Sequence, residues 1–122
     1  NGLYYAPTVL DHVTKQMKIA KEEIFEPIVV IMRVKNYEEG IKLANDSRYA
    51  LHASVFTNDI DKAIDAGMRI EAGGVQINAA PSRGPDNFPF GGDKESGIGR
   101  EGIKYTIQEM TKIHSIVLNL RR

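Results

Sequence analysis

The glycine-rich stretch PFGGDKESGIGREG, residues 89–102, is the segment whose residue types most directly imply chemistry. Its last six residues spell G-x-G-x-x-G, a pattern with which a strand-to-helix turn holds a pyrophosphate at a helix N-terminus. Such a turn needs a hydrophobic strand directly before it and an acidic residue about 20 positions later. Here GGDKES precedes the motif, and the later positions read IVLNL. The context therefore predicts that these glycines bend a loop and allow close packing instead of binding a dinucleotide.

Other side chains with chemical potential are scattered along the chain. Phe90 lies between Pro89 and Gly91 in a long irregular segment, and the residues alone leave open whether it lines a pocket or packs in a core. Glu23 in KEE and Arg83 in SRGPD have the simpler interpretation of solvated surface charges. The three histidines lie far apart without a paired spacing, so no metal site is expected. Cysteine is absent, which excludes disulfides and a thiolate nucleophile within this sequence.

Composition narrows the class of protein. The 122 residues carry 16 basic and 16 acidic side chains, so the formal net charge is zero and no nucleic-acid or membrane-surface partner is expected. No apolar run reaches the roughly 20 residues of a membrane helix, and no signal sequence is visible, so a cytoplasmic location is expected. The first residue is Asn1 and the sequence enters a strand-like run almost at once, so we expect a fragment of a longer protein.

Hydrophobic patterning predicts alternating strands and helices. The run IVVIMRV, residues 28–34, has the continuous β-branched character of a strand covered on both faces, and we expect it to be central in a sheet. Asn36 is the predicted N-cap of a helix, with Glu39 in a capping-box position, and Asn58 is the predicted cap of the next helix, which Gly73 and Gly74 close. The predicted strands and helices occupy residues 4–10, 28–34, 36–45, 50–57, 59–72 and 75–78.

This order predicts an α/β fold, a parallel open sheet with flanking helices. Residues 79–99 form a long segment rich in glycine and proline, which is expected to be functional or disordered. A helix is predicted within residues 101–112, with Ile103, Ile107 and Met110 on one side, and a last strand within residues 113–120.

Three separated segments resemble one known family. PTVL, KEEIFEPIVVI and FPFGGDKESGIGREG are similar, in order and spacing, to the C-terminal part of the aldehyde dehydrogenase superfamily. The stretch NAAPSRGPDNFPFGG looks most like the branch that contains lactaldehyde dehydrogenase and non-phosphorylating glyceraldehyde-3-phosphate dehydrogenase. The resemblance implies that residues 1–112 are the C-terminal part of the catalytic domain. It also implies that residues 113–122 supply a terminal strand of an oligomerisation element, in a homotetramer or homodimer.

The resemblance further implies oxidation of a small aldehyde, such as lactaldehyde, to the acid with NAD or NADP. Family members use a cysteine nucleophile, a glutamate base and a Rossmann domain that binds most of the cofactor, and all three are expected upstream of this sequence. We therefore expect the chain alone to be inactive.

The same resemblance assigns roles to individual residues. Glu23 is implied to accept hydrogen bonds from the nicotinamide ribose hydroxyls and Phe25 to lie beside the nicotinamide, where the plain alternative is a core aromatic. Phe90 is implied to line the aldehyde pocket, and Arg83 to lie near the substrate, where its guanidinium suits a phosphate or a hydroxyaldehyde.

Three further positions in the matching segments lack such a role. Glu26 stands where the family usually has glycine, and we expect the turn to survive because a glutamate tolerates the extended backbone favoured before proline. Lys94 and Ser96 match the family motif, and we expect them to anchor the loop.

A second hypothesis remains open from the residues. The chain could be a stand-alone, non-catalytic module that binds a partner through its terminal strand, and the absence of cysteine favours this alternative.

Overall fold

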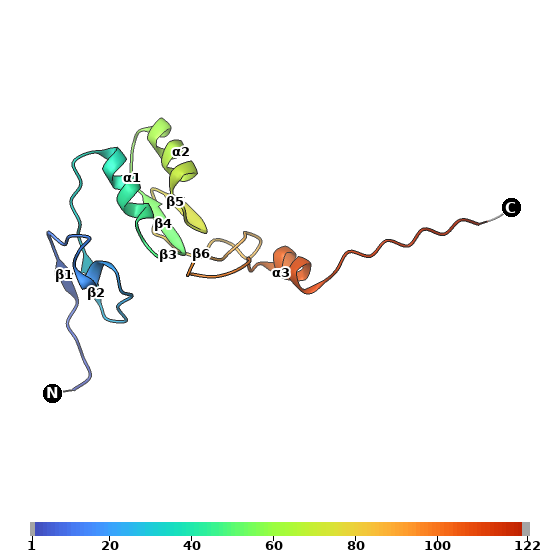
Figure 1. Cartoon of the computed structure of the whole chain (residues 1–122), viewed down its shortest axis with the longest axis horizontal. Coiled ribbons are helices and arrows are strands. Elements are labelled where there is room, and N and C mark those ends of the chain that lie inside the picture. Colours follow the sequence, from blue (N-terminus) through green and yellow to red (C-terminus); the bar gives the residue numbers. More distant parts are fainter. Residues whose placement is uncertain (1, 121–122) are drawn as a thin grey trace. The chain divides into compact units, whose positions relative to one another are not determined.

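The computed structural model describes residues 2–120, which fall into two compact units separated between Arg48 and Tyr49 (Figure 1). Asn1, on which the expectation of a fragment partly depended, and Arg121 and Arg122, at the end of the expected terminal strand, lie outside the described residues. The elements in chain order are β1 Thr8–Leu10, the 3-10 helix η1 Lys18–Ala20, β2 Ile28–Val30, α1 Tyr37–Asn45, β3 Tyr49–Ala50, β4 His52–Val55, α2 Ile60–Arg69, β5 Gly74–Ile77, β6 Asp93–Lys94 and α3 Ile103–Met110.

The first unit is built on a parallel pair of strands. β1 and β2 pair in parallel with Thr8 opposite Ile28. β2 is shorter than the predicted strand of residues 28–34, and among the described residues it pairs only with β1, so the expectation of a central strand is wrong for this chain. The ladder ends because β1 turns away at His12, which adopts a left-handed backbone with φ 57°. Ile31, directly after β2, still donates to the carbonyl of Leu10 at 2.8 Å and accepts from the N–H of Val13 at 3.1 Å, so the backbone contact extends one residue beyond the paired strands.

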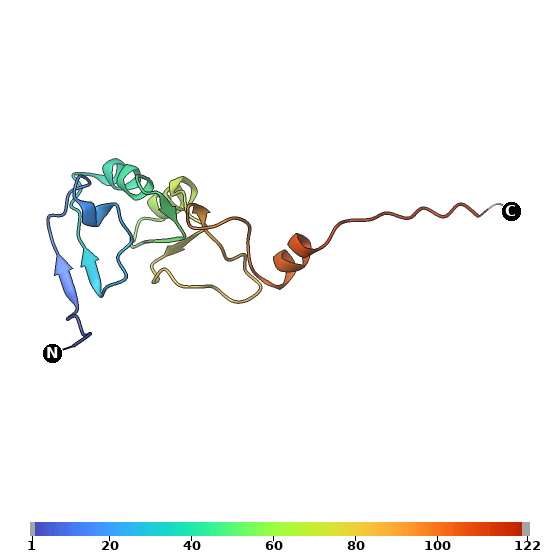
Figure 2. The same ribbon diagram turned by 60° about the horizontal axis from the view of Figure 1, so that its bottom comes forward.

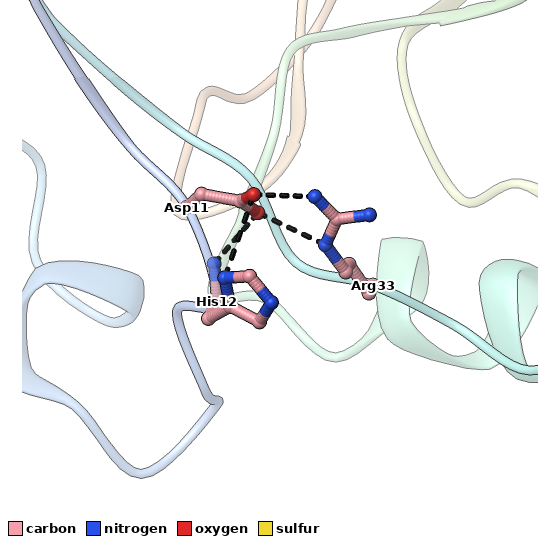
Figure 3. Close-up of polar contacts among 3 residues, drawn as sticks. All are labelled: Asp11, His12 and Arg33. Atoms are coloured by element: carbon pink, nitrogen blue, oxygen red, sulfur yellow. Dashed lines mark hydrogen bonds and ion pairs between the residues drawn. The ribbon is translucent and has the colours of Figure 1, made fainter.

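An ion pair holds together the segments that follow the two strands (Figure 3). The carboxylate of Asp11 accepts hydrogen bonds from the guanidinium of Arg33, with Nε at 3.2 Å, and from the backbone N–H of His12 at 2.7 Å. These donors lower the pKa of Asp11, first through the Arg33 side chain and then through the His12 amide. The contact therefore fixes the turn after β1 while the carboxylate is ionised.

Helix α1 begins where the sequence predicts. The side chain of Asn36 accepts a hydrogen bond from the backbone N–H of Glu39 at 2.9 Å, which confirms the predicted N-cap. The carboxylate of Glu39 accepts in return from the backbone N–H of Lys35 at 2.6 Å, one residue before the cap. Ile41 of this helix is buried, as is Val13, and the two are the buried apolar residues of the first unit.

The second unit contains a second parallel pair. β4 and β5 pair in parallel with His52 opposite Gly74, and α2 lies between them in sequence and against them in space (Figure 2). The predicted strand of residues 50–57 is interrupted at Leu51, because Ala50 in β3 pairs in antiparallel fashion with β6 and His52 begins the pairing with β5. The α/β class with parallel strands and flanking helices is confirmed, although the described strands form three two-stranded sheets.

The ends of α2 correct two predictions. The N-cap is Asp59, not Asn58, because the Asp59 side chain accepts from the backbone N–H groups of Asp61 and Lys62, both at 3.1 Å. These amides and the Lys62 ammonium lower the pKa of Asp59, with the Lys62 amide the largest cause. The helix ends at Arg69, and Gly73 and Gly74 do not close it. Their N–H groups bond to the carbonyls of Ala50 and Leu51, which starts β5 one residue earlier than predicted.

The C-terminal part lacks one predicted element. α3 confirms the helix expected within residues 101–112. The described residues 113–120 form no strand, and both views show them as an extended segment after α3. A strand needs a partner for its backbone groups, and among residues 2–120 none lies alongside this segment. Within the same residues, no helix is long and apolar enough to cross a membrane.

Candidate functional site

The first group of predicted site residues lies in the irregular segment between η1 and β2. Both Glu23 and Phe25 are exposed, Phe25 to 91% of its surface, so Phe25 is not a core aromatic of this chain. Within residues 2–120, no hydrogen bond or ion pair engages the Glu23 carboxylate, whereas its neighbour Glu22 pairs with Lys18 at 3.4 Å. An unengaged carboxylate and a bare aromatic face, two residues apart, fit a ligand with vicinal hydroxyls and a flat ring.

The turn that follows these residues accommodates the unusual Glu26. In the described part of the chain, the non-glycine residues with positive φ are His12, Asn78 and Lys94, so Glu26 adopts an ordinary backbone. The carbonyl of Glu26 accepts from the backbone N–H of Ile28 at 2.7 Å. The turn survives the glutamate, as expected.

The second group of site residues comes together in the second unit. Arg83 and Phe90 were predicted separately from the loop sequence, and the Arg83 guanidinium carbon lies 5.1 Å from the centroid of the Phe90 ring. A guanidinium at that distance from a ring is held by a cation–π interaction. The guanidinium also lies 3.7 Å from the carboxylate of Asp86 and 3.8 Å from that of Glu101. The loop thus presents one aromatic and one cation side by side.

Phe90 is half-buried, and its backbone is fixed. Its N–H donates to the carbonyl of Glu101 at 3.0 Å, and its carbonyl accepts from the N–H of Glu101 at 2.6 Å. This two-bond bridge closes the base of the glycine-rich loop. It fixes the main chain of Phe90.

The glycines of the loop are required by close packing, which confirms their predicted structural role. A Cβ on Gly91 would lie 2.6 Å from the Gly99 carbonyl oxygen, and a Cβ on Gly92 would lie 2.4 Å from Cβ of Ser96. Gly97, Gly99 and Gly102 have φ angles of 158°, 76° and 118°. The last two values lie in the region that other residues avoid, so glycine is needed there to lead the chain into α3.

Three polar side chains anchor the same loop. The Ser96 hydroxyl accepts from the backbone N–H of Ala50 at 2.8 Å, and the Lys94 ammonium pairs with Glu71 at 3.0 Å, so the expected anchoring by both residues is confirmed. Arg100 donates to the carbonyls of Gly92 and Gly99 and to the Asp93 carboxylate, at 3.0, 2.8 and 2.5 Å. The sequence analysis did not predict an anchoring role for Arg100.

A cavity adjoins the Arg83 side chain. It measures about 690 Å³ and is lined by Arg83, Asp86, Glu101, Gly102, Ile103, Thr106 and Ile107. One wall is therefore charged and the other is the apolar side of α3. This hollow is open to solvent, and Phe90 is not among its lining residues. Within residues 2–120, no cluster of three or more His, Asp or Glu side chains could hold a metal ion.

Sequence reasoning missed the ring of His52, which packs against Phe90, and the two carboxylates beside Arg83. A signal was present at Gly74, because a glycine inside a strand often marks a place where another group approaches closely. The pairing of His52 with Gly74 depends on the register of β4 and β5, which the pattern alone did not give.

Comparisons with known proteins extend over nearly the whole chain. The profile of the "Aldehyde dehydrogenase family" matches residues 1–116. A wheat (Triticum aestivum) NADP-dependent glyceraldehyde-3-phosphate dehydrogenase is 52% identical over 114 residues, 93% of this chain and 23% of that protein. A lactaldehyde dehydrogenase of Methanococcus maripaludis is 46% identical over 119 residues, 98% of this chain and 25% of that protein.

Solved structures of aldehyde dehydrogenases are similar to this chain in both fold and sequence. NADP-dependent glyceraldehyde-3-phosphate dehydrogenase from Bacillus halodurans, complexed with NADP, superposes with a TM-score of 0.89 at 51% identity, over 94% of this chain and 24% of that one. A Mycobacterium tuberculosis aldehyde dehydrogenase complexed with NAD+ gives a TM-score of 0.81 at 40% identity, over 87% and 22%. The chain spans about a quarter of the length of the curated relatives it matches. On the family profile and these identities, the chain belongs to the aldehyde dehydrogenase family.

Proposed function

We propose that this chain supplies part of the cofactor site and part of the aldehyde site of an NAD(P)-dependent enzyme that oxidises a small hydroxyaldehyde, with lactaldehyde as the preferred substrate. The observation that carries the proposal is the pairing of Arg83 with Phe90 on a fixed loop, in a chain of this family. Relatives named as lactaldehyde dehydrogenase and as NADP-dependent glyceraldehyde-3-phosphate dehydrogenase support the two substrate classes that need comparison.

Glu23 and Phe25 of the first unit are assigned to cofactor contacts. The bound nicotinamide cofactor supplies the acceptor for the hydride that leaves the substrate carbon. The free Glu23 carboxylate would accept hydrogen bonds from two vicinal ribose hydroxyls of the cofactor and so hold the sugar. The exposed face of Phe25 would offer the nicotinamide an apolar contact that excludes water.

The aldehyde side is assigned to Phe90 and Arg83. The half-buried Phe90 ring provides an apolar wall for the carbon chain of the substrate. The Arg83 guanidinium donates hydrogen bonds to an oxygen at the far end of the molecule and so orients the carbonyl. The half-exposed guanidinium lies in the wall of a cavity of about 690 Å³, where a small hydroxyaldehyde can reach it.

The charges around Arg83 support an uncharged substrate. Asp86 and Glu101 lie within 4 Å of the guanidinium, so its positive charge is already shared between two carboxylates. A phosphate dianion placed beside Arg83 would also lie close to both carboxylates, and like charges repel. A hydroxyl group accepts the same hydrogen bond without that repulsion, which favours lactaldehyde over glyceraldehyde 3-phosphate.

The chain alone is expected to be inactive, because its sequence has no cysteine to act as the thiolate nucleophile that family members use. The exposed apolar side chains Ile113, Ile116, Leu118 and Leu120 follow α3. They support the proposal that this segment adds a strand to a neighbouring subunit in a homodimer or homotetramer.

A comparison of substrates tests the proposal. The full-length protein is given lactaldehyde and glyceraldehyde 3-phosphate, each with NAD and with NADP, and kcat/KM is measured from the reduced nicotinamide formed. We expect lactaldehyde to give the higher kcat/KM, and Arg83→Ala to lower that value by about tenfold through loss of one hydrogen bond from a charged donor. A preference for the phosphorylated aldehyde would contradict the proposed substrate.

A further inference from the structure

The ring of Phe90 has a second neighbour besides Arg83. The imidazole of His52, in β4, lies with its centroid 5.2 Å from that of Phe90, and the two ring planes are perpendicular, at 88°. This is the edge-to-face arrangement that aromatic pairs prefer. His52 therefore contacts the side chain that the proposed function places in the aldehyde site, although the two residues are 38 positions apart in the sequence, from 52 to 90.

The position of the imidazole depends on a glycine in the adjacent strand. Gly74 is the register partner of His52 in β5. A Cβ built on Gly74 would lie 2.9 Å from both Cδ2 and Nε2 of the imidazole, a separation that real Cβ atoms do not show. The φ of Gly74 is outside the left-handed region, so conformational freedom is not what requires glycine there. The missing side chain leaves the space in which the imidazole lies.

The backbone of Phe90 is fixed, but it does not determine the orientation of the ring, which depends on the contacts with His52 and Arg83. The bridge to Glu101 fixes the main chain of Phe90, and Gly91 beside it packs against the Gly99 carbonyl. The ring itself can still rotate about its side-chain bonds. Within residues 2–120, the ring makes an aromatic contact with His52 and a cation–π contact with Arg83.

We propose that His52 is a positioning residue that fixes the ring plane of Phe90, and that it thereby sets which aldehydes the site prefers. The inference rests on the proposed function, because it takes Phe90 as a wall of the aldehyde site. His52 acts through Phe90 and touches neither substrate nor cofactor. Gly74 contributes to the orientation of the Phe90 ring because it has no side chain that would displace the imidazole of His52.

Four variants of the full-length protein test the inference: His52→Ala, His52→Phe, Gly74→Ala and the double variant His52→Ala with Gly74→Ala. The measured quantity is the ratio of kcat/KM for a small aldehyde, lactaldehyde, to that for a bulky one, benzaldehyde, together with KM for the cofactor. His12→Asn is the matched control, because it removes an exposed imidazole from the first unit. Thermal unfolding checks that each variant is folded.

The inference predicts a definite pattern. His52→Ala changes the ratio by about three- to tenfold, the range for one aromatic pair, while KM for the cofactor stays at the wild-type value. His52→Phe keeps the aromatic contact and restores the ratio to within about twofold. Gly74→Ala changes the ratio in the same direction as His52→Ala, because the new methyl group displaces the imidazole. In the double variant Gly74→Ala adds nothing, because no imidazole remains to be displaced.

Other outcomes overturn the inference and separate it from the proposed function. An unchanged ratio in folded His52→Ala would show that His52 does not position Phe90. An equal effect of Gly74→Ala with and without His52 would show that the glycine acts by another route. A wild-type protein that oxidises no aldehyde with NAD or NADP would overturn the proposed function and this inference together.

Discussion

Asn78 shows how one residue secures the end of the β4–β5 pair. Its side-chain oxygen accepts from the backbone N–H of Thr57 at 2.8 Å, and its side-chain nitrogen donates to the Thr57 carbonyl at 2.9 Å. Its backbone has φ 54°, in the left-handed region that asparagine tolerates better than most residues. Residues 79–88, which carry Arg83, leave the sheet directly after it.

Replacement of Asn78 therefore affects both the hydrogen bonds and the backbone. We predict that Asn78→Ala lowers the free energy of unfolding by about 1–3 kcal/mol, because two hydrogen bonds are lost and alanine is disfavoured at positive φ. Asn78→Gly removes the same hydrogen bonds but relaxes the backbone, and it should be less destabilised. Chemical denaturation of both variants measures the two contributions. Equal free energies of unfolding for Asn78→Ala and wild type would show that the hydrogen bonds between Asn78 and Thr57 do not stabilise the fold.

Glu23 is the residue on which the proposed cofactor contact depends. Glu23→Gln keeps the size of the side chain but removes its charge and one acceptor, and we predict about a tenfold rise in KM for the nicotinamide cofactor. Glu22→Gln is the control, since Glu22 is adjacent and pairs with Lys18. Steady-state kinetics on the full-length protein compare the two. An equal KM for Glu23→Gln and wild type would remove Glu23 from the site.

The elements were predicted best where a short-range signal sets them. α1 begins at its predicted cap because Asn36 and Glu39 meet within one turn, and α3 was found from its apolar spacing. The start of α2 was misplaced by one residue. There the Thr57 hydroxyl accepts from the Asp59 N–H, and Asn78 ties Thr57 to β5, so a contact 21 positions away fixes where the helix can start. Such a contact is not visible in local sequence.

The cap of α2 predicts a dependence of stability on pH. The folded-state pKa of Asp59 is lowered from 3.8, so the ionised cap stabilises the fold above that pH, and this contribution is lost as the pH falls below it. We predict that Asp59→Ala has a lower Tm than wild type at neutral pH, and that the difference shrinks below about pH 4. Asp59→Asn caps without ionising, so it should lack this dependence. A difference in Tm between Asp59→Ala and wild type that stays constant from about pH 7 to below about pH 4 would contradict the role of the ionised Asp59 as the cap.

The approach of the glycine-rich loop to β5 predicts opposite effects at two glycines. A Cβ on Gly73 would lie 1.6 Å from the carbonyl oxygen of Gly91, so Gly73→Ala must displace the loop backbone, and we expect a loss of about 1–3 kcal/mol. Gly67, in α2, has nothing within 4 Å of its Cβ position, and Gly67→Ala should stabilise the helix by about 0.5–1 kcal/mol. Thermal unfolding compares the pair. A neutral Gly73→Ala would contradict the close approach.

At the scale of the whole molecule, much of the apolar surface of the chain has no cover of its own. Ala63 and Ala66 are the buried residues of α2, while Ile60, Ile64 and Met68 on the same helix are exposed. Apolar residues of α3 are exposed as well. Surfaces of this kind mark contacts with further protein. These exposed surfaces are consistent with a chain that spans about a quarter of the length of its relatives.

The same fact explains what sequence reasoning could reach in the candidate site. Arg83 and Phe90 lie seven positions apart on one loop, from 83 to 90, and each was assigned to the substrate from the motif resemblance, whereas the contact between their side chains is a finding of the structure. His52 escaped notice because its contact with Phe90 depends on the return of the loop over β4 and on the space at Gly74. A terminal strand was expected within the run IHSIVLNL, but pairing requires a partner strand that residues 2–120 do not supply.

The most direct test of the account is the reaction itself. The full-length protein is incubated with lactaldehyde and NAD or NADP, and the reduced nicotinamide and the lactate formed are both measured. The account predicts that the two products appear in equal amounts and that the isolated 122-residue chain forms neither. Formation of no reduced nicotinamide and no lactate by the full-length protein would contradict the account and would favour a non-catalytic module.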